Sequence, residues 1–96
     1  MSKESFEQFT TVLASIPAGR YTSYGALAKL CGVHVRQVQA WMRRLPPGTG
    51  LPWHRVINSQ RKITEHAGAS EQKHRLIIEG VTPNASGRYP VEQFWP

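Results

Sequence analysis

Residues 23–45 read SYGALAKLCGVHVRQVQAWMRRL, and their pattern is the strongest indication of the fold. Thr22 or Ser23 is expected to cap a first helix, because a side-chain hydroxyl can accept hydrogen bonds from the free N–H groups of the first turn. The helix is expected to end at Cys31, since Gly32 suits the left-handed conformation that commonly follows a helix. The stretch therefore predicts a short helix followed by a tight turn.

A second helix is expected from about His34 to Leu45, where Pro46-Pro47 ends it. Its apolar face repeats at three- and four-residue steps and consists of Val35, Val38, Met42 and Leu45. The opposite face carries Arg36, Ala40, Arg43 and Arg44. Two short helices joined in this way predict a helix-turn-helix, whose second helix enters a DNA groove. A solvated basic face is the alternative interpretation of this helix on its own.

Amphipathic helices are expected on both sides of this stretch. The first runs from about Lys3 to Ser15, and its apolar residues are Phe6, Phe9, Leu13 and Ile16. The last runs from about Ser70, which serves as its N-cap, to Glu79, and Gly80 ends it. The residues of the last helix expected to point inward are Leu76, Ile77 and Ile78.

A small β-hairpin is expected before the last helix. Val56-Ile57 and Ile63-Thr64 can pair across residues 58–62, and such a hairpin beside a helix-turn-helix is a wing. The tail, residues 82–96, is rich in Pro, Asn, Ser and Gly and is expected to be irregular, with Phe94-Trp95 packed back. The predicted fold class is mainly α: a single winged helix-turn-helix domain over all 96 residues, with a three-helix core, a β-hairpin wing and a C-terminal helix.

The net charge of +6 is concentrated in one block of the chain. No Asp or Glu occurs from Gln8 to Thr64, whereas this segment holds the cations Arg20, Lys29, Arg36, Arg43, Arg44, Arg55, Arg61 and Lys62. A polyanion such as DNA is the natural partner of such a block, with an affinity that falls steeply as salt rises. The alternative is a basic surface that serves only solubility.

Several kinds of protein are disfavoured by the composition. No stretch approaches the roughly 20 apolar residues of a membrane span, and Lys3, Glu4 and Glu7 take the place of an apolar signal core, so a cytoplasmic protein is expected. The one cysteine, Cys31, excludes an internal disulfide. The histidines show no metal-ligand spacing with it, so neither a metal nor another cofactor is expected.

Residues 52–56 read PWHRV. This segment resembles the active-site signature Pro-Cys-His-Arg-Val of the O6-alkylguanine-DNA alkyltransferases, in which the Cys thiolate takes the alkyl group from the damaged base. Trp53 stands at the Cys position, and this change is characteristic of the alkyltransferase-like proteins, which bind lesions without repairing them. Further segments match the family in order and spacing: residues 16–20, 23–28, 34–38, 58–59 and 78–80.

The resemblance implies that two residues flip a nucleotide. A base inside the stack must be rotated out before its O6 atom can be inspected, which costs a few kcal/mol. In the family, a Tyr at the start of the first helix of the helix-turn-helix turns the nucleotide, and an Arg early in the second helix, the recognition helix, enters the stack. These residues correspond to Tyr24 and Arg36. From the residues alone, Tyr24 can instead be a core aromatic and Arg36 a simple phosphate contact.

The resemblance also implies a pocket for the alkylated base, formed by Trp53, Val56 and Tyr24. The indole face offers an apolar wall to an alkyl group, and the main-chain carbonyls of Trp53 and Val56 stand where the family accepts the guanine amino group. Alternatively, Trp53 fills the core and closes the pocket. Contacts to the DNA backbone or groove are expected from Thr22, Ser23, Gln37, Ala40, Arg43, Arg44 and Lys62.

His54 and Glu79 match residues that activate the Cys in the transferases. Because no thiol is present, we interpret them as a hydrogen-bonded pair that keeps its shape without a catalytic role, and we expect Arg55 to brace the loop. Leu45 stands where the transferases have an Asn that ties this loop. A different loop and a wider pocket are therefore expected.

The function expected from the resemblance is a non-enzymatic sensor, because an indole has no nucleophile to offer. As a monomer it would bind duplex DNA that contains O6-alkylguanine and flag the lesion for nucleotide excision repair proteins. When bound to DNA it would be associated with the nucleoid. One alternative is a sequence-specific winged-helix regulator that reads bases with Arg36, Gln37, Gln39 and Arg43. Another is an enzyme that uses Cys31 or His54, for which the sequence offers no supporting arrangement.

Overall fold

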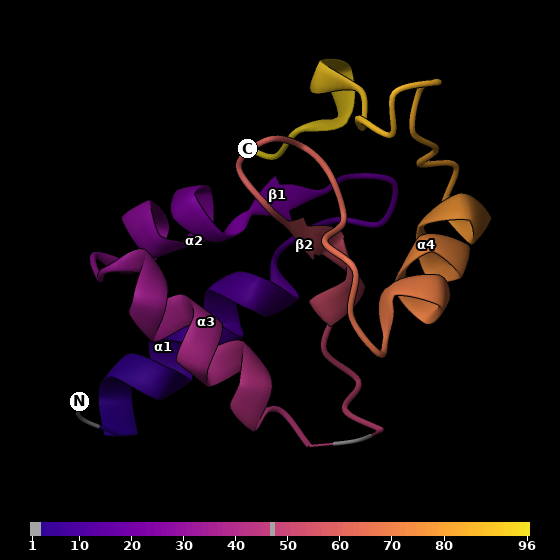
Figure 1. Cartoon of the computed structure of the whole chain (residues 1–96). Helices are drawn as coiled ribbons and strands as arrows, with labels where there is room; N and C mark the ends of the chain where they lie inside the picture. The colour runs from indigo at the N-terminus through magenta and orange to yellow at the C-terminus, as the bar shows by residue number, and fades with distance from the viewer. Residues whose placement is uncertain (1–2, 47) are drawn as a thin grey trace.

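The structure, a computed structural model, describes residues 3–46 and 48–96. Pro47, part of the expected stop after the second helix, lies outside the described residues. The described elements are α1 (Lys3–Ala14), β1 (Thr22–Ser23), α2 (Tyr24–Cys31), α3 (Val35–Arg44), the 3-10 helix η1 (Trp53–Arg55), β2 (Val56–Ile57), α4 (Ala69–Ile78) and the 3-10 helix η2 (Val91–Gln93). Helices α1, α2 and α3 pack together, and α4 lies apart from them beyond β2 (Figure 1).

The helix-turn-helix is confirmed, and α2 has the predicted caps. The Ser23 hydroxyl accepts a hydrogen bond from the Ala26 N–H at 3.0 Å, and Gly32 follows α2 with a φ of 68°. His34 caps α3, since its Nδ1 accepts from the Arg36 N–H at 3.1 Å. The free N–H groups at the start of each helix are thus hydrogen-bonded by the side chain that directly precedes the helix in sequence.

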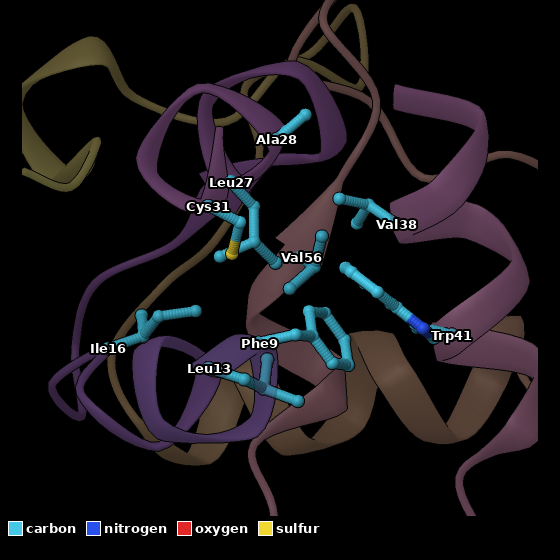
Figure 2. Close-up of a cluster of buried hydrophobic side chains, with 9 residues drawn as sticks. All are labelled: Phe9, Leu13, Ile16, Leu27, Ala28, Cys31, Val38, Trp41 and Val56. Carbon is cyan, nitrogen blue, oxygen red and sulfur yellow. The ribbon is translucent and has the colours of Figure 1, made fainter. Parts of the chain in front are cut away.

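The main hydrophobic core lies between α1, α2, α3 and β2. Its buried side chains point toward one another in Figure 2 and are Phe9, Leu13, Ile16, Leu27, Ala28, Cys31, Val38, Trp41 and Val56. Trp41 is 1% exposed and lies 5.2 Å from Phe9 between ring centroids, although the predicted apolar face of this helix omitted it. Met42 and Leu45, which were included, are only half-buried.

The predicted hairpin wing is wrong. Strand β2 pairs in parallel with β1, with Thr22 opposite Val56 and Ser23 opposite Ile57, and in the described chain residues 63–64 belong to no strand. Residues 58–62 do form a closed turn, because the Asn58 side chain accepts hydrogen bonds from two backbone N–H groups within it. β2 was expected to pair with the chain that follows it, but it pairs with β1.

Helix α4 departs from the prediction at its start and on its buried face. It begins at Ala69 after Gly68, and no side chain caps it, so Ser70 lies in the first turn and is not the N-cap. Ile77 and Ile78 are 53% and 71% exposed, which contradicts the inward placement predicted for them. The buried residues follow helical spacing and are Ala69, Gln72 and Leu76. Positions 77 and 78 are therefore rotated away from the core.

The tail packs back on the domain, as predicted, although it includes η2. The Trp95 N–H donates to the Tyr21 carbonyl at 2.8 Å, and Tyr21 forms an isolated bridge with Phe94. Tyr89 is 1% exposed in a second core cluster with Tyr21 and Leu76. Over residues 3–46 and 48–96, none of the helices is both long and apolar enough to cross a bilayer.

Candidate nucleic-acid interface

A cavity of about 730 Å³ opens between the recognition helix α3, the loop that follows it, and α4. Its lining comes from five separate parts of the chain. The lining residues are Tyr24, Gln39, Met42, Arg43, Leu45, Pro46, Gly48, Thr49, Trp53, Thr64, His66, Glu71 and Arg75. A flipped base and its substituent are comparable in size with ligands that fill cavities of this volume.

Trp53 forms one wall of this cavity. The backbone N–H of Trp53 donates to the Leu51 carbonyl at 2.8 Å, and the backbone carbonyl of Trp53 accepts a hydrogen bond from the Val56 N–H at the end of η1. The indole is half-buried, and the Arg75 guanidinium lies over it at 5.6 Å from the ring centroid. The ring therefore lines the space without filling the core, contrary to the alternative interpretation.

Tyr24 lies at the start of α2 and also lines the cavity. Burial raises the pKa of its hydroxyl, and the nearby charge of Arg43 opposes that shift. The hydroxyl is thus protonated at neutral pH and can donate to a phosphate oxygen. This side chain is half-buried beside the cavity and does not lie deep in the core.

The three arginines of α3 have different surroundings. Arg36 is exposed in the first turn, where an entering side chain would have to be, and it does not line the cavity. Arg43 is exposed near the other end of the helix and lines the cavity. Arg44 lies over the Phe6 ring at 5.5 Å, on the side of α1. Gln37 and Ala40 are half-buried on the same helix.

Two of the expected DNA contacts are poorly placed for that role. Thr22 is fully buried, and its hydroxyl has no hydrogen-bond partner among the described residues, so it cannot reach a phosphate without a local rearrangement. Ser23 is 7% exposed, and its oxygen already caps α2. Both side chains are withdrawn because they lie on β1, between β2 and α2. Lys62 is half-buried at the end of the 58–62 turn.

Val56 does not line the cavity, and its main-chain carbonyl, the group expected to accept the guanine amino group, is already hydrogen-bonded. It is fully buried in the main core, and its carbonyl accepts a hydrogen bond from Gln72 Nε2 at 2.9 Å. The same amide donates to the His54 carbonyl at 3.3 Å. Gln72 therefore ties the active-site-like segment to α4, a role that its place in a polar helix face did not predict.

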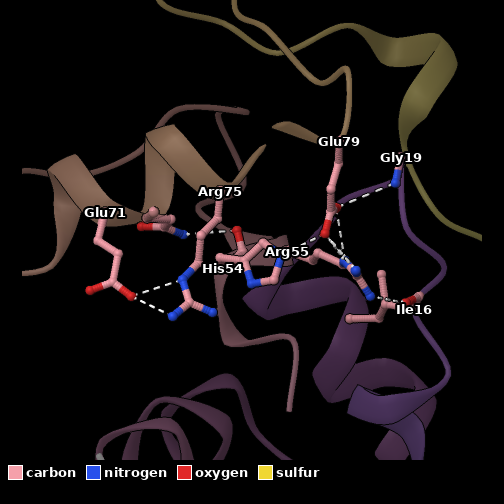
Figure 3. Close-up of polar contacts among 8 residues, drawn as sticks. Ile16, Gly19, His54, Arg55, Glu71, Arg75 and Glu79 are labelled. Atoms are coloured by element: carbon pink, nitrogen blue, oxygen red, sulfur yellow. Dashed lines mark hydrogen bonds and ion pairs between the residues drawn. The ribbon is translucent and has the colours of Figure 1, made fainter. Parts of the chain in front are cut away.

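His54 and Glu79 form the predicted pair, with 2.9 Å between His54 Nε2 and Glu79 Oε2 (Figure 3). Burial lowers the pKa of His54, although Glu79 opposes this, so the imidazole is neutral at pH 7 and donates from Nε2. Its buried Nδ1 has no partner among the described residues. In the part of the chain that the structure describes, neither ring nitrogen of His54 is hydrogen-bonded to a hydroxyl or thiol, so the pair serves to hold the segment in place.

Arg55 braces this segment, as predicted. Its guanidinium donates to both carboxylate oxygens of Glu79 and to the Ile16 carbonyl at 2.8 Å (Figure 3). Burial by itself raises the pKa of the carboxyl group, but hydrogen bonds from Arg55, His54 and the Gly19 N–H lower it to about 2. Glu79 thus remains charged and joins η1 to the chain after α1 and to the end of α4.

Sequence reasoning missed the residues that α4 contributes to the cavity. Arg75 and Glu71 both line it, and Arg75 Nε donates to Glu71 Oε2 at 2.8 Å (Figure 3). Their i,i+4 spacing was visible as an ordinary helix-surface pair. Nothing in the sequence indicated that this surface faces Trp53, because that depends on how α4 packs against η1.

The comparisons with known proteins show which family the chain belongs to. Residues 4–81 match the family described as 6-O-methylguanine DNA methyltransferase, DNA binding domain. The chain belongs to this family, among its alkyltransferase-like members. It is 39% identical over 99 residues to a DNA base-flipping protein of Escherichia coli K12, a match that covers 98% of the chain and 77% of the relative.

Two further relatives come from Schizosaccharomyces pombe. Alkyltransferase-like protein 1 is 40% identical over 83 residues, which are 81% of this chain and 77% of the relative. The crystal structure of the S. pombe protein Atl1 with damaged DNA containing O6-carboxymethylguanine superposes with a TM-score of 0.84 at 34% identity, over 100% of this chain and 98% of that one. This chain therefore shares its mainly helical fold with a protein whose structure was solved in complex with damaged DNA.

Proposed function

We propose that this protein recognises O6-alkylguanine in duplex DNA by receiving the flipped base in the cavity beside Trp53, and that it transfers no alkyl group. The observation that carries the proposal is an open cavity next to the recognition helix, with an indole as one wall and Tyr24 at its edge. The relatives named as base-flipping and alkyltransferase-like proteins support the same function.

Flipping is assigned to two residues on the helix-turn-helix. Tyr24 donates to and crowds the phosphate of the target nucleotide, and Arg36, exposed in the first turn of α3, occupies the gap that the base leaves. A guanidinium suits that gap, because its plane stacks on bases while its donors reach the orphaned partner. The free energy of extrusion is offset by apolar contact between the alkylated base and the cavity wall.

The absence of transfer follows from the chemistry of the residues at hand. Trp53 has no basic lone pair or acidic proton from which a nucleophile could be made. Cys31 is buried at the C-terminal end of α2, burial raises the pKa of its thiol, and the helix dipole there disfavours a thiolate. His54 Nε2 is already engaged by Glu79, and within residues 3–46 and 48–96 its Nδ1 is hydrogen-bonded to no hydroxyl or thiol.

The cellular role is proposed from the expected family behaviour. A monomer bound to the lesion in the nucleoid would mark it for nucleotide excision repair proteins. Leu45 and Pro46 line the cavity at the place where the transferases tie their loop, so a substituent larger than methyl is proposed to fit as well.

One titration tests the proposed function. A duplex with a single O6-methylguanine and its undamaged twin are bound at one stated salt concentration, and the titration is repeated in a second, unrelated sequence. The damaged duplex should bind at least about tenfold more tightly in both sequences, as expected for a few additional apolar contacts. Equal affinity for damaged and undamaged DNA, with strong dependence on sequence, would instead identify a winged-helix regulator.

A further inference from the structure

The cavity has a charged side as well as an apolar one. Glu71 and Arg75 lie on α4 and line the cavity, and the Arg75 guanidinium lies 5.6 Å from the centroid of the Trp53 ring. Arg43 is the other cation among the described lining residues, and Glu71 is the one carboxylate among them. A substituent that contacts the Trp53 indole therefore lies close to the Arg75 guanidinium as well.

The Glu71–Arg75 ion pair is exposed, so another anion can replace Glu71 as the partner of Arg75 at low cost. The two groups approach to 2.6 Å, but the side chains are 56% and 45% exposed, so water competes for both partners. Exposed i,i+4 pairs contribute little to stability, and separating one costs correspondingly little. A base in the cavity would remove water from Arg75, which strengthens any charge-assisted hydrogen bond that the guanidinium then forms.

We propose that Arg75 is a specificity-determining residue that binds a negatively charged O6 substituent, and that Glu71 competes with this substituent for the guanidinium. The inference rests on the proposed function and adds to it the chemical class of adduct that the site distinguishes. A carboxylate on the substituent displaces the Glu71 carboxylate, which contacts Arg75 through Oε2, and binds the guanidinium through both of its own oxygens. A neutral substituent leaves the ion pair intact and contacts Trp53 alone.

The test compares two adducts that differ in charge and hardly in shape. Duplexes carry a single O6-carboxymethylguanine or its neutral isostere O6-carbamoylmethylguanine, and the ratio of their dissociation constants is measured at one salt concentration. Arg75→Gln should reduce the preference for the carboxylate about fivefold, and Glu71→Gln should increase it by about threefold, as expected for a partly exposed charged hydrogen bond. Both side chains are half-exposed, so both variants should keep the helical circular dichroism of the native protein.

Two controls separate local from overall charge. Arg88→Gln and Glu92→Gln make the same changes in net charge at exposed positions of the tail that do not line the cavity. They should shift the affinity for both duplexes equally and leave the ratio unchanged. If Arg75→Gln and Glu71→Gln behave like these controls, the inference is wrong.

The same series keeps this inference distinct from the proposed function. O6-methylguanine and undamaged duplexes are titrated alongside with each protein. A preserved preference for the methyl lesion, together with a charge ratio that no α4 variant changes, refutes only the role of Arg75 and Glu71. Equal binding of the methylated and undamaged duplexes refutes the proposed function, and the assignment of Arg75 with it.

Discussion

At the scale of single residues, Glu79 has the largest structural task. Its carboxylate accepts hydrogen bonds from Arg55, from His54 and from the Gly19 N–H, which come from two other parts of the chain. In the transferases the matching residues are thought to activate a thiol. Here the same constellation positions η1, and with it the Trp53 wall of the cavity.

Replacement of this carboxylate should therefore reduce stability more than an ordinary ion-pair deletion does. We expect Glu79→Gln to lower the free energy of unfolding by about 2 kcal/mol, because Arg55 is left partly buried without its counter-charge. Urea denaturation measures the change. Glu71→Gln is the matched control, since it breaks an exposed Glu–Arg pair and should cost below about 0.5 kcal/mol. Equal losses would show that the Glu79 network is not a structural anchor.

The same carboxyl group predicts a pH dependence. Its pKa is lowered from 4.5 to about 2, so the folded protein binds fewer protons there than the unfolded chain does. The stabilisation is therefore complete above pH 4.5 and is lost as the pH falls toward 2. The difference in unfolding free energy between the native protein and Glu79→Gln should shrink over this interval. A difference that stays constant down to pH 2 would contradict the assignment.

Arg36 tests the flipping step. Arg36→Ala should reduce the preference for the lesion about tenfold, because nothing then occupies the gap in the stack. Lys29→Ala removes the same charge from an exposed position on α2 and should weaken binding to damaged and undamaged duplexes alike. Competition titrations with the two duplexes measure both effects. If Arg36→Ala lowers the affinity for both duplexes equally, Arg36 contacts only phosphates and does not enter the stack.

At the scale of elements, the helices were predictable and the strand pairing was not. The caps of α2, Ser23 and Gly32, lie beside the helix in sequence, so local chemistry identified them, whereas the His34 cap of α3 was not predicted. The partner of β2 is far away in sequence, and a single chain gave no signal for a parallel pair with β1. The buried face of α4 likewise depends on its packing against η1.

The turn between α2 and α3 offers a test at this scale. Gly32 has a φ of 68°, and a Cβ built there would meet no heavy atom within 4 Å. Gly32→Ala should therefore cost about 1 kcal/mol of unfolding free energy through backbone strain alone. Gly50→Ala, at another open position without a positive φ, should be close to neutral. Thermal unfolding of the two variants compares them, and equal midpoints would contradict a strained turn.

At the scale of the whole molecule, the sequence indicated the surface better than the cavity. The acid-free block from Gln8 to Thr64 and the resemblance in residues 52–56 predicted a DNA-binding protein with an indole where the transferases have a thiol. The cavity itself combines residues of α2, α3, the loop before η1 and α4, and its charged side on α4 appears only in the folded chain. The residues that line the cavity were therefore predictable near the motif at residues 52–56, and those on α4 were not.

The central claim is that the lesion is held in this cavity without chemical change. Its most direct test is to saturate the protein with a duplex that contains O6-methylguanine, release the complex after prolonged incubation, and weigh both the protein and the DNA strand by intact-mass spectrometry. We predict that the complex forms, that the strand keeps its methyl group, and that the protein gains no mass. A methyl group lost from the strand, or found on the protein at Cys31 or elsewhere, would contradict the account.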